Sequence, residues 1–215
     1  MLRLKFDTGE RSLQRVLCLG AHCDDIEIGC GGTILRLIEE LPDLEFCWVV
    51  FASDEQRRCE GARSAELFLL GAQKKQVIFQ SFRDGFFPYI GAEIKEIFLK
   101  LEKEFFPDLV FTHYRFDLHQ DHRLISELTW NSFRDHLILE YEIPKYDGDL
   151  GSPNLFSPLA PEICKRKLEY LLTSFESQKS KHWFTEDTFL ALMRLRGVQC
   201  GARYAEAFYA RKLCA

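Results

Sequence analysis

The chain has 215 residues, of which 47% are hydrophobic and 28% are charged. This composition provides for one sizeable core and argues against intrinsic disorder. The formal net charge of -5 disfavours nucleic acid as a partner, because a phosphate backbone requires a basic surface. No apolar run is long enough to cross a membrane, and the first residues lack the apolar region of a secretory signal. We therefore expect a cytoplasmic protein without a membrane span.

The eight cysteines form no CxxC pair, and several of them lie inside apolar, strand-like runs. Without an export signal, neither a secreted disulfide framework nor a thiolate zinc cluster is expected. We expect mostly buried free thiols in a reducing compartment.

The first part of the chain alternates short apolar runs with helix-like segments. Strands are expected at residues 16–19, 46–52, 77–79 and 109–112, and helices at 33–40, 57–70 and 92–104. This alternation predicts an α/β fold with a mostly parallel sheet that is covered by helices on both faces. The near-continuous apolar strands favour the same fold, because parallel strands are buried on both sides.

The pattern changes after residue 140. The segment 144–158, PKYDGDLGSPNLFSP, is rich in turn-forming residues, so we expect an ordered surface loop. Helices are expected at 161–174 and 187–196, the first of them opening on a proline. We expect a single domain over residues 1–215, with a core at about 15–135 and a substrate loop and irregular C-terminal elements at about 140–215.

Two polar clusters follow predicted strands. AHCDDIE occupies residues 21–27 after the first strand, and HYRFDLHQDHR occupies residues 113–123 after the fourth. The carboxyl ends of parallel strands form the crevice in which ligands bind, so both clusters should face one site. A catalytic zinc takes three His or carboxylate ligands and keeps one open position. His22 and Asp25 can converge on one ion, with a third ligand from the second cluster.

Simpler interpretations exist for each motif. An isolated HxxD more commonly caps a helix or lies on the surface, and Asp121 could cap the following helix with His119 and His122 merely exposed. The placement of both clusters after strands favours the metal site. The glycine run at 29–32 lacks the spacing of a nucleotide-binding loop, so we interpret it as a turn from which a helix starts beneath the metal loop.

These motifs also resemble a known family. AHCDDIEIGCGGT is similar to the AHPDD(x)E signature of the PIG-L/LmbE-like deacetylases, LHQDHR to their HxDH signature, and GARYAEAF to their G…AEAF element. The correspondences run from about residue 15 to residue 209, and Cys23 departs from the usual proline. The resemblance implies a Rossmann-like three-layer sandwich, one zinc ion per chain, and hydrolysis of N-acetyl groups from amino sugars or related molecules.

The resemblance also assigns roles by position. The implied zinc ligands are His22, Asp25 and His122, and the implied catalytic residues are Asp24, His119 and Asp121. Asp24 would act as the base toward a water whose pKa is lowered by zinc to roughly 7. Asp121 would orient His119 and favour its charged form. Either Asp24 or His119 could protonate the leaving amine.

Substrate residues are harder to predict. Arg63 lies where the family has an arginine before E…LG, and the segment 142–151 resembles a family branch associated with bacterial polysaccharide and glycoconjugate synthesis. The predicted substrate-binding residues are Arg63, Lys145, Asp147 and Asn154. Lys145 or Arg123 could pair with a phosphate if the sugar is carried on a nucleotide or lipid, whereas a merely solvated loop is an equal alternative.

Three functions remain open from the sequence. The first is an N-deacetylase acting on a small N-acetylated molecule such as a sugar, and the second is an amidase for a thiol or other small amide conjugate. The third is a metal-binding module without turnover, which Asp24 and His119 argue against, since a binding site needs no base. Mixed His and carboxylate ligands would also accept iron or cobalt. The sequence leaves the oligomeric state open, a homo-oligomer included.

Overall fold

The computed structural model describes residues 13–213. Its strands are β1 (Arg15–Gly20), β2 (Glu45–Val50), β3 (Lys74–Phe79), β4 (Leu109–His113), β5 (Leu137–Tyr141), β6 (Leu155–Leu159) and β7 (Tyr204–Tyr209). Its α-helices are α1 (Asp25–Glu40), α2 (Glu55–Phe68), α3 (Gly91–Glu104), α4 (Gln120–Ser132), α5 (Pro161–Ser174) and α6 (Glu186–Cys200). Two short 3-10 helices, η1 (Phe87–Tyr89) and η2 (Glu176–Gln178), complete the described elements.

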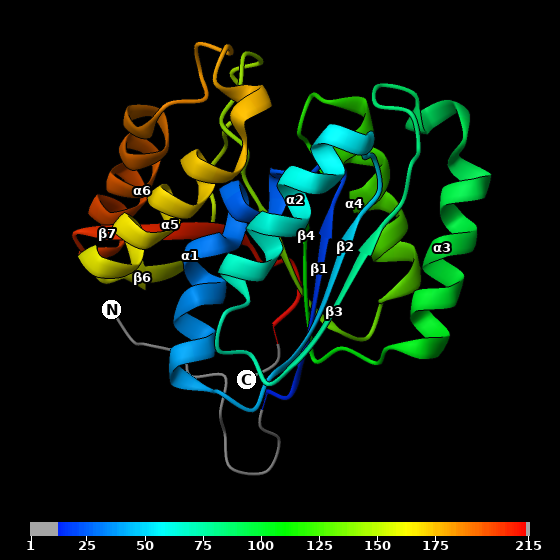
Figure 1. Ribbon diagram of the computed structural model, residues 1–215. Helices are drawn as coiled ribbons and strands as arrows, with labels where there is room; N and C mark the ends of the chain where they lie inside the picture. Colours follow the sequence, from blue (N-terminus) through cyan, green and yellow to red (C-terminus); the bar gives the residue numbers. More distant parts are fainter. Residues whose placement is uncertain (1–12, 214–215) are drawn as a thin grey trace.

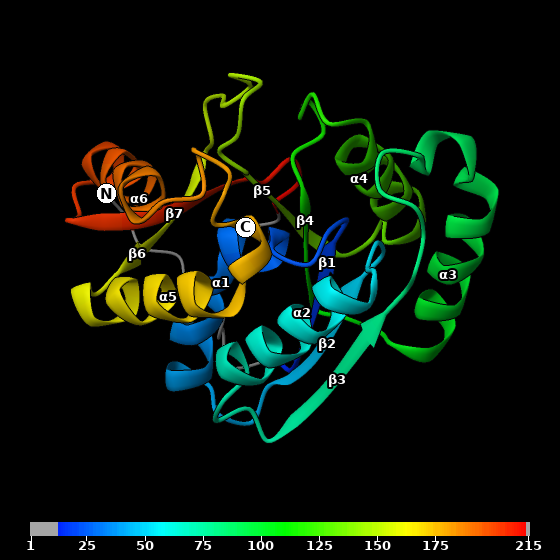
Figure 2. The same ribbon diagram turned by 45° about the horizontal axis from the view of Figure 1, so that its top comes forward.

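The strands form one sheet in the order β3-β2-β1-β4-β5-β7-β6. Strands β1 to β5 are parallel, whereas β7 runs antiparallel to β5 and to β6. Helices α1, α2 and α5 lie on one side of the sheet and α3 and α4 on the other (Figure 1, Figure 2). The expected α/β fold with a mostly parallel sheet is therefore confirmed. The chain order reverses between β1 and β4, which opens a crevice beyond the carboxyl ends of these two strands.

The sheet separates two hydrophobic clusters, and alternate residues of each strand face one or the other. In β2, Phe46 and Trp48 pack with the cluster under α1 and α2, whereas Cys47 and Val49 pack with the cluster under α3 and α4. Strands buried on both faces are apolar at every position, which is why their sequences show continuous rather than alternating hydrophobicity.

Helix α1 corrects one expectation. It begins at Asp25, so the glycine run lies inside the helix and forms no turn. A Cβ atom at Gly29 would lie 2.1 Å from Cδ2 of Tyr141, and one at Gly31 would lie 2.5 Å from Cε1 of Phe68. The glycines are therefore needed because α1 packs directly against the rings of β5 and α2, a close approach that any side chain would block.

A buried ion pair crosses α1 at the same level. The Glu206 carboxylate, on β7, accepts the amides of Gly32 and Thr33 at 2.8 and 2.7 Å. Lys167, on α5, donates to Glu206 at 2.6 Å and to the carbonyl of Ile28 at 2.7 Å. In a regular α-helix, the Gly32 amide donates to this carbonyl, which lies four residues earlier. Two side chains from the C-terminal part thus bind backbone groups in the middle of the first helix.

The C-terminal part is more regular than expected. The predicted loop at 144–158 ends at residue 154, because residues 155–159 form β6. Strand β6 lies at the edge of the sheet, where Pro158 costs no ladder hydrogen bond. Strands β5 and β7 were also not expected, and α6 extends beyond the predicted 187–196 until Gly201, whose φ of 74° ends it.

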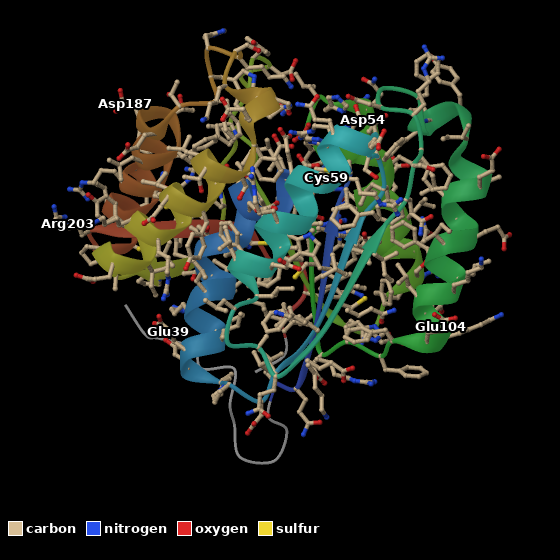
Figure 3. All side chains as sticks on the ribbon, viewed as in Figure 1. Glu39, Asp54, Cys59, Glu104, Asp187 and Arg203 are labelled. Carbon is tan, nitrogen blue, oxygen red and sulfur yellow. The ribbon has the colours of Figure 1, made fainter. Side chains whose placement is uncertain are left out.

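The described cysteines are free, as expected. Five of them are buried, and Cys59 is exposed on the outer side of α2 (Figure 3). Cys214 lies outside the described residues. None of the helices within residues 13–213 has the length and apolarity to cross a membrane.

Candidate metal centre

The three predicted metal ligands lie together at the crevice. His22 lies in the turn after β1, Asp25 in the first turn of α1, and His122 in the first turn of α4. His22 Nδ1 is 3.1 Å from His122 Nε2 and 3.4 Å from Asp25 Oδ2, and His122 Nε2 is 3.5 Å from Asp25 Oδ1. Ligand bonds of about 2.0–2.1 Å in a tetrahedron give ligand-to-ligand distances of about 3.3–3.4 Å. The spacing of the two imidazole nitrogens fits one tetrahedral ion, and Asp25 approaches each of them with a different oxygen, Oδ2 toward His22 and Oδ1 toward His122.

The protonation states of two of the three ligands suit a metal. Burial alone would lower the pKa of His22, but Asp25, Asp121 and Asp84 raise it well above its ordinary value. Burial and the neighbouring His113 lower the pKa of His122 to about 4, so that its imidazole is neutral at pH 7. Burial alone would raise the pKa of Asp25, but His122, His113 and His22 around it hold that pKa well below its ordinary value. A neutral imidazole and an ionised carboxylate are the forms that bind a metal.

Asp117 fixes the orientation of His122. Its Oδ2 lies 2.9 Å from His122 Nδ1, which directs Nε2 toward Asp25. Asp117 also accepts the amide of His119 at 2.8 Å and lies 3.0 Å from Lys145 Nζ. Burial alone would raise the pKa of Asp117, but the His122 hydrogen bond and the charges of His122 and Lys145 hold it well below its ordinary value. A carboxylate behind a ligating histidine sets its tautomer and strengthens its binding.

Other donor groups overlap with this triad. Within residues 13–213, donor atoms also converge in the sets His22, His119 and His122; His22, Asp84, His119 and Asp121; and Asp25, His113 and His122. His113 was not predicted as a site residue. Its Nε2 accepts the amide of Ala21 at 2.9 Å, and its ring stacks on His122 with centroids 3.9 Å apart. A nitrogen occupied by a backbone amide supports the metal loop and is not free to bind an ion.

Asp24 occupies a different environment from its neighbour Asp25. It is buried at the start of α1, and its Oδ1 accepts a hydrogen bond from Arg57 Nη2 at 2.6 Å. Arg57 lies in the first turn of α2, and its guanidinium stacks over Phe175 at 5.2 Å. Arg57 was not predicted from the sequence. It follows β2 at the same edge of the sheet as the two motifs, and this position could have indicated a site residue.

His119 lies against the triad, but Asp121 does not orient it. The His119 ring is 4.8 Å from that of His22 and 4.5 Å from that of His122, measured between centroids. The Asp121 carboxylate instead accepts the amides of Gly85 and Phe87 and lies 3.4 Å from His22 Nε2. The expectation that Asp121 orients His119 is therefore corrected.

Asp121 raises the pKa of His119, as expected, but its influence is not the largest one. Burial and the charge of His22 lower the pKa of His119, and these effects outweigh the opposite influence of Asp25 and Asp121.

Two of the four predicted substrate residues have structural roles instead. The Arg63 guanidinium donates to the carbonyls of Thr173 and Ser174 at the end of α5, at 3.1 and 2.5 Å. The Asn154 side chain bonds the backbone of Ala210 through both its nitrogen and its oxygen. Arg123 likewise binds backbone carbonyls, of Asp117 and Leu118, and so is not the phosphate partner considered above.

The remaining two lie on the loop beside the site. Lys145 is almost fully buried and contacts Asp149 at 2.5 Å as well as Asp117, so it supports the metal centre from behind and is not free to bind a phosphate. The Asp147 side chain is 41% exposed and 3.8 Å from Lys145, which leaves it accessible to a ligand.

Comparison with known proteins identifies the family. The family model described as PIG-L, GlcNAc-PI de-N-acetylase, matches residues 17–133, more than half of the chain. The chain belongs to the PIG-L family. As a PIG-L protein it is a hydrolase of the amide-cleaving, N-deacetylase type.

Solved structures share the fold of this PIG-L protein at low sequence identity. N,N'-diacetylchitobiose deacetylase from Pyrococcus horikoshii is 23% identical with a TM-score of 0.68, over 95% of this chain and 86% of that one. The conserved protein TT1542 from Thermus thermophilus is 19% identical with a TM-score of 0.72, over 94% and 96%. GalB, the 4-carboxy-2-hydroxymuconate hydratase from Pseudomonas putida, is 15% identical with a TM-score of 0.69, over 94% and 98%. A hydratase shares the fold as well, so the fold alone does not determine the reaction.

Proposed function

We propose that this PIG-L protein is a zinc-dependent hydrolase that removes the N-acetyl group from an amino sugar or a carrier-linked amino sugar. One observation carries the proposal: donor atoms of His22, Asp25 and His122 lie 3.1–3.5 Å apart, and Asp24 next to them is available as a base. The mixed imidazole and carboxylate donors support zinc, one ion per chain. We further propose that the chain works as one domain in the cytoplasm.

The residues divide the work as follows. When bound, the metal supplies Lewis acidity, which lowers the pKa of a water and polarises the acetyl carbonyl. Arg57 fixes Asp24 through Oδ1, and we assign Oδ2 of Asp24 to accepting the proton of the attacking water. The His119 ring lies against His22 and His122 and is placed to donate to the oxygen on which charge develops. Asp117 holds His122, and Lys145 holds Asp117.

The loop between β5 and β6 supports a sugar as the substrate. Tyr146 is 64% exposed, and the side chain of Asp147, which follows it in the chain, is 41% exposed, so this loop offers an accessible aromatic ring and an accessible carboxylate. A sugar presents an apolar ring face and hydroxyl groups, which these two side chains complement. Asp147 therefore remains a proposed substrate residue, whereas Arg63, Lys145 and Asn154 do not.

The direct test is acetate release by the zinc-loaded protein from a panel of substrates. The panel should contain free, nucleotide-linked and lipid-linked N-acetylamino sugars, together with N-acetylated thiol conjugates and simple amides. We expect turnover of at least one sugar, loss of turnover after chelation, and recovery when zinc is restored. Turnover confined to a thiol conjugate would support the alternative amidase function, and absence of turnover across the panel would contradict the proposal.

A further inference from the structure

A cleft lined by arginines lies beside α4. It has a volume of about 360 Å³, and its walls include Arg115, Arg134 and Arg211 together with Ser126 and Trp130 of α4. Arg115 lies in the loop after β4, Arg134 in the turn after α4, and Arg211 directly after β7. None of these residues belongs to the donor sets that converge within residues 13–213. Three separate segments of the chain thus bring guanidinium groups to one place, which we call the arginine cleft.

One of the three arginines is paired with a buried carboxylate. Arg211 binds Glu140, which is fully buried in β5. Oε1 of Glu140 also accepts Trp130 Nε1 at 2.5 Å, and its Oε2 accepts the amide of Arg115 at 3.1 Å. Burial lowers the pKa of Arg211, Glu140 opposes this effect, and the charge of Arg115 lowers it further. The two guanidinium groups are therefore close enough to repel each other, and both oxygens of Glu140 are already used.

The other two arginines have only neutral partners. The guanidinium of Arg115 is exposed and lies 5.4 Å from the ring centre of Phe116. That of Arg134 is exposed as well and donates to the backbone and side-chain oxygens of Asn131 at 3.2 and 3.3 Å. Neither arginine forms an ion pair within residues 13–213, so both positive charges are uncompensated.

A further acidic group lines the cleft but does not cancel this charge. Glu127 is exposed on α4 and forms no ion pair with the three arginines in the described part of the chain. Lys212 offsets it, with its ammonium group 5.5 Å from the ring centre of Trp130. The three arginines and Lys212 thus meet two carboxylates, those of Glu127 and Glu140, and a surplus of two positive charges remains.

The wall of the cleft also contains an unused hydroxyl group. Ser126 is fully buried, and its Oγ has no hydrogen-bond partner among the described residues. Buried hydroxyl groups normally have a partner, because a missing hydrogen bond costs free energy. An anion that carries several oxygens is the kind of ligand that supplies such a partner.

We propose that the arginine cleft binds a phosphate group, either as free phosphate or as the phosphate of a small monoester. A dianion matches the surplus of two positive charges, and guanidinium groups bind phosphate oxygens through paired N–H donors. Bound phosphate would connect the loop after β4, α4 and the segment after β7, so it should stabilise the folded chain. The site uses none of the metal ligands and does not depend on the proposed deacetylase function.

Calorimetric titration of the zinc-loaded full chain tests the proposal. Inorganic phosphate is titrated against a chloride buffer of equal ionic strength, and we expect it to bind and to raise the melting temperature as its concentration rises. The double variant Arg115→Gln/Arg134→Gln should bind phosphate at least about tenfold more weakly, because it removes both uncompensated charges. Glucose 6-phosphate is titrated in parallel. Tighter binding than that of phosphate would identify a monoester as the ligand, and weaker binding would identify free phosphate.

The matched control is Arg203→Gln. Arg203 is also exposed, and its guanidinium lies 5.4 Å from the ring centre of Tyr204. It lies between α6 and β7, at the edge of the molecule (Figure 3). This variant should bind phosphate like the wild type, and so should the wild-type protein after its zinc has been removed by a chelator.

Three results would overturn the phosphate site. They are absence of binding of both phosphate compounds by the wild type, equal weakening in the control and the double variant, and binding that disappears after chelation, which would place the phosphate on the metal. Acetate release is not part of this experiment, so its failure leaves the deacetylase proposal standing, and the reverse holds too.

Discussion

Asp24 and Asp25 are chemically identical neighbours in different surroundings. Asp25 lies among three histidines, whereas Asp24 is held by Arg57. Asp24→Asn keeps the size of the side chain but removes its basic oxygen, so kcat should fall by about a hundred- to ten-thousand-fold with metal content unchanged. Asp25→Asn should instead lower the metal content. Elemental analysis and steady-state kinetics on the two variants check this division, and equal loss of metal in both would contradict it.

Asp117 provides a second prediction at this scale. Asp117→Asn leaves His122 in place but removes the carboxylate behind it, so metal affinity should fall by about 10- to 100-fold. Competition with a chromophoric chelator measures the change. Asp147→Asn is the control, because it alters an exposed carboxylate of the neighbouring loop. A metal affinity unchanged by the Asp117 substitution would show that this residue only anchors the loop.

The site residues that could be predicted are those grouped in short motifs. His22 and Asp25 lie within four positions, and His119, Asp121 and His122 lie within four others, so local spacing alone brings them into one hypothesis. The contacts of Arg57 with Asp24 and of Lys145 with Asp117 join distant segments, which spacing does not encode. His113 lies in the second motif, but its contact with the amide of Ala21 could not be predicted from it. The same reason explains Arg63, which was chosen by its position in the family pattern, and Asn154, which was chosen as part of a polar loop. Both side chains bind backbone groups instead.

At the scale of elements, α1 is constrained by contact and not by turn geometry. Gly31→Ala would place a methyl group 2.5 Å from the Phe68 ring, so we expect a loss of about 1–3 kcal/mol of unfolding free energy. Gly91→Ala in α3 is the matched control, because its nearest neighbour would be Leu124 at 3.7 Å. The control should be neutral or stabilising by up to about 1 kcal/mol. Urea unfolding compares the two, and equal stability would show that α1 can shift away from α2.

Strands β1, β2 and β4 could be predicted because they are buried on both faces and alternate with helical segments. Strands β6 and β7 could not, because their sequences contain proline, serine and glutamate and become strands by pairing with each other and with β5. Glu206 illustrates the difficulty. A buried glutamate in a strand is understandable only once α1 and Lys167 lie beside it.

At the scale of the whole molecule, the Lys167–Glu206 pair connects the C-terminal part of the chain to α1, because both side chains bind backbone groups of that helix. Removing one partner leaves the other charge buried, so Lys167→Met should cost about 3–5 kcal/mol of unfolding free energy. The adjacent Arg166 pairs with Glu39, which lies on the surface of α1 (Figure 3). Arg166→Met should therefore cost at most about 1 kcal/mol. Denaturant titration of both variants tests the difference. Similar costs for the two would contradict a special role of the buried pair.

The contact of Glu206 with α1 also bears on how the protein is made. The ribosome releases the metal loop and α1 early, yet the carboxylate that binds the amides of Gly32 and Thr33 is synthesised more than 170 residues later. Nascent chains begin to fold from their N-terminal end. In this protein α1 lacks its contacts with Glu206 until β7 has been synthesised. On the ribosome, the helix that carries Asp25 is therefore missing these hydrogen bonds. We therefore expect the nascent protein to acquire its metal last, as the final strand closes the sheet.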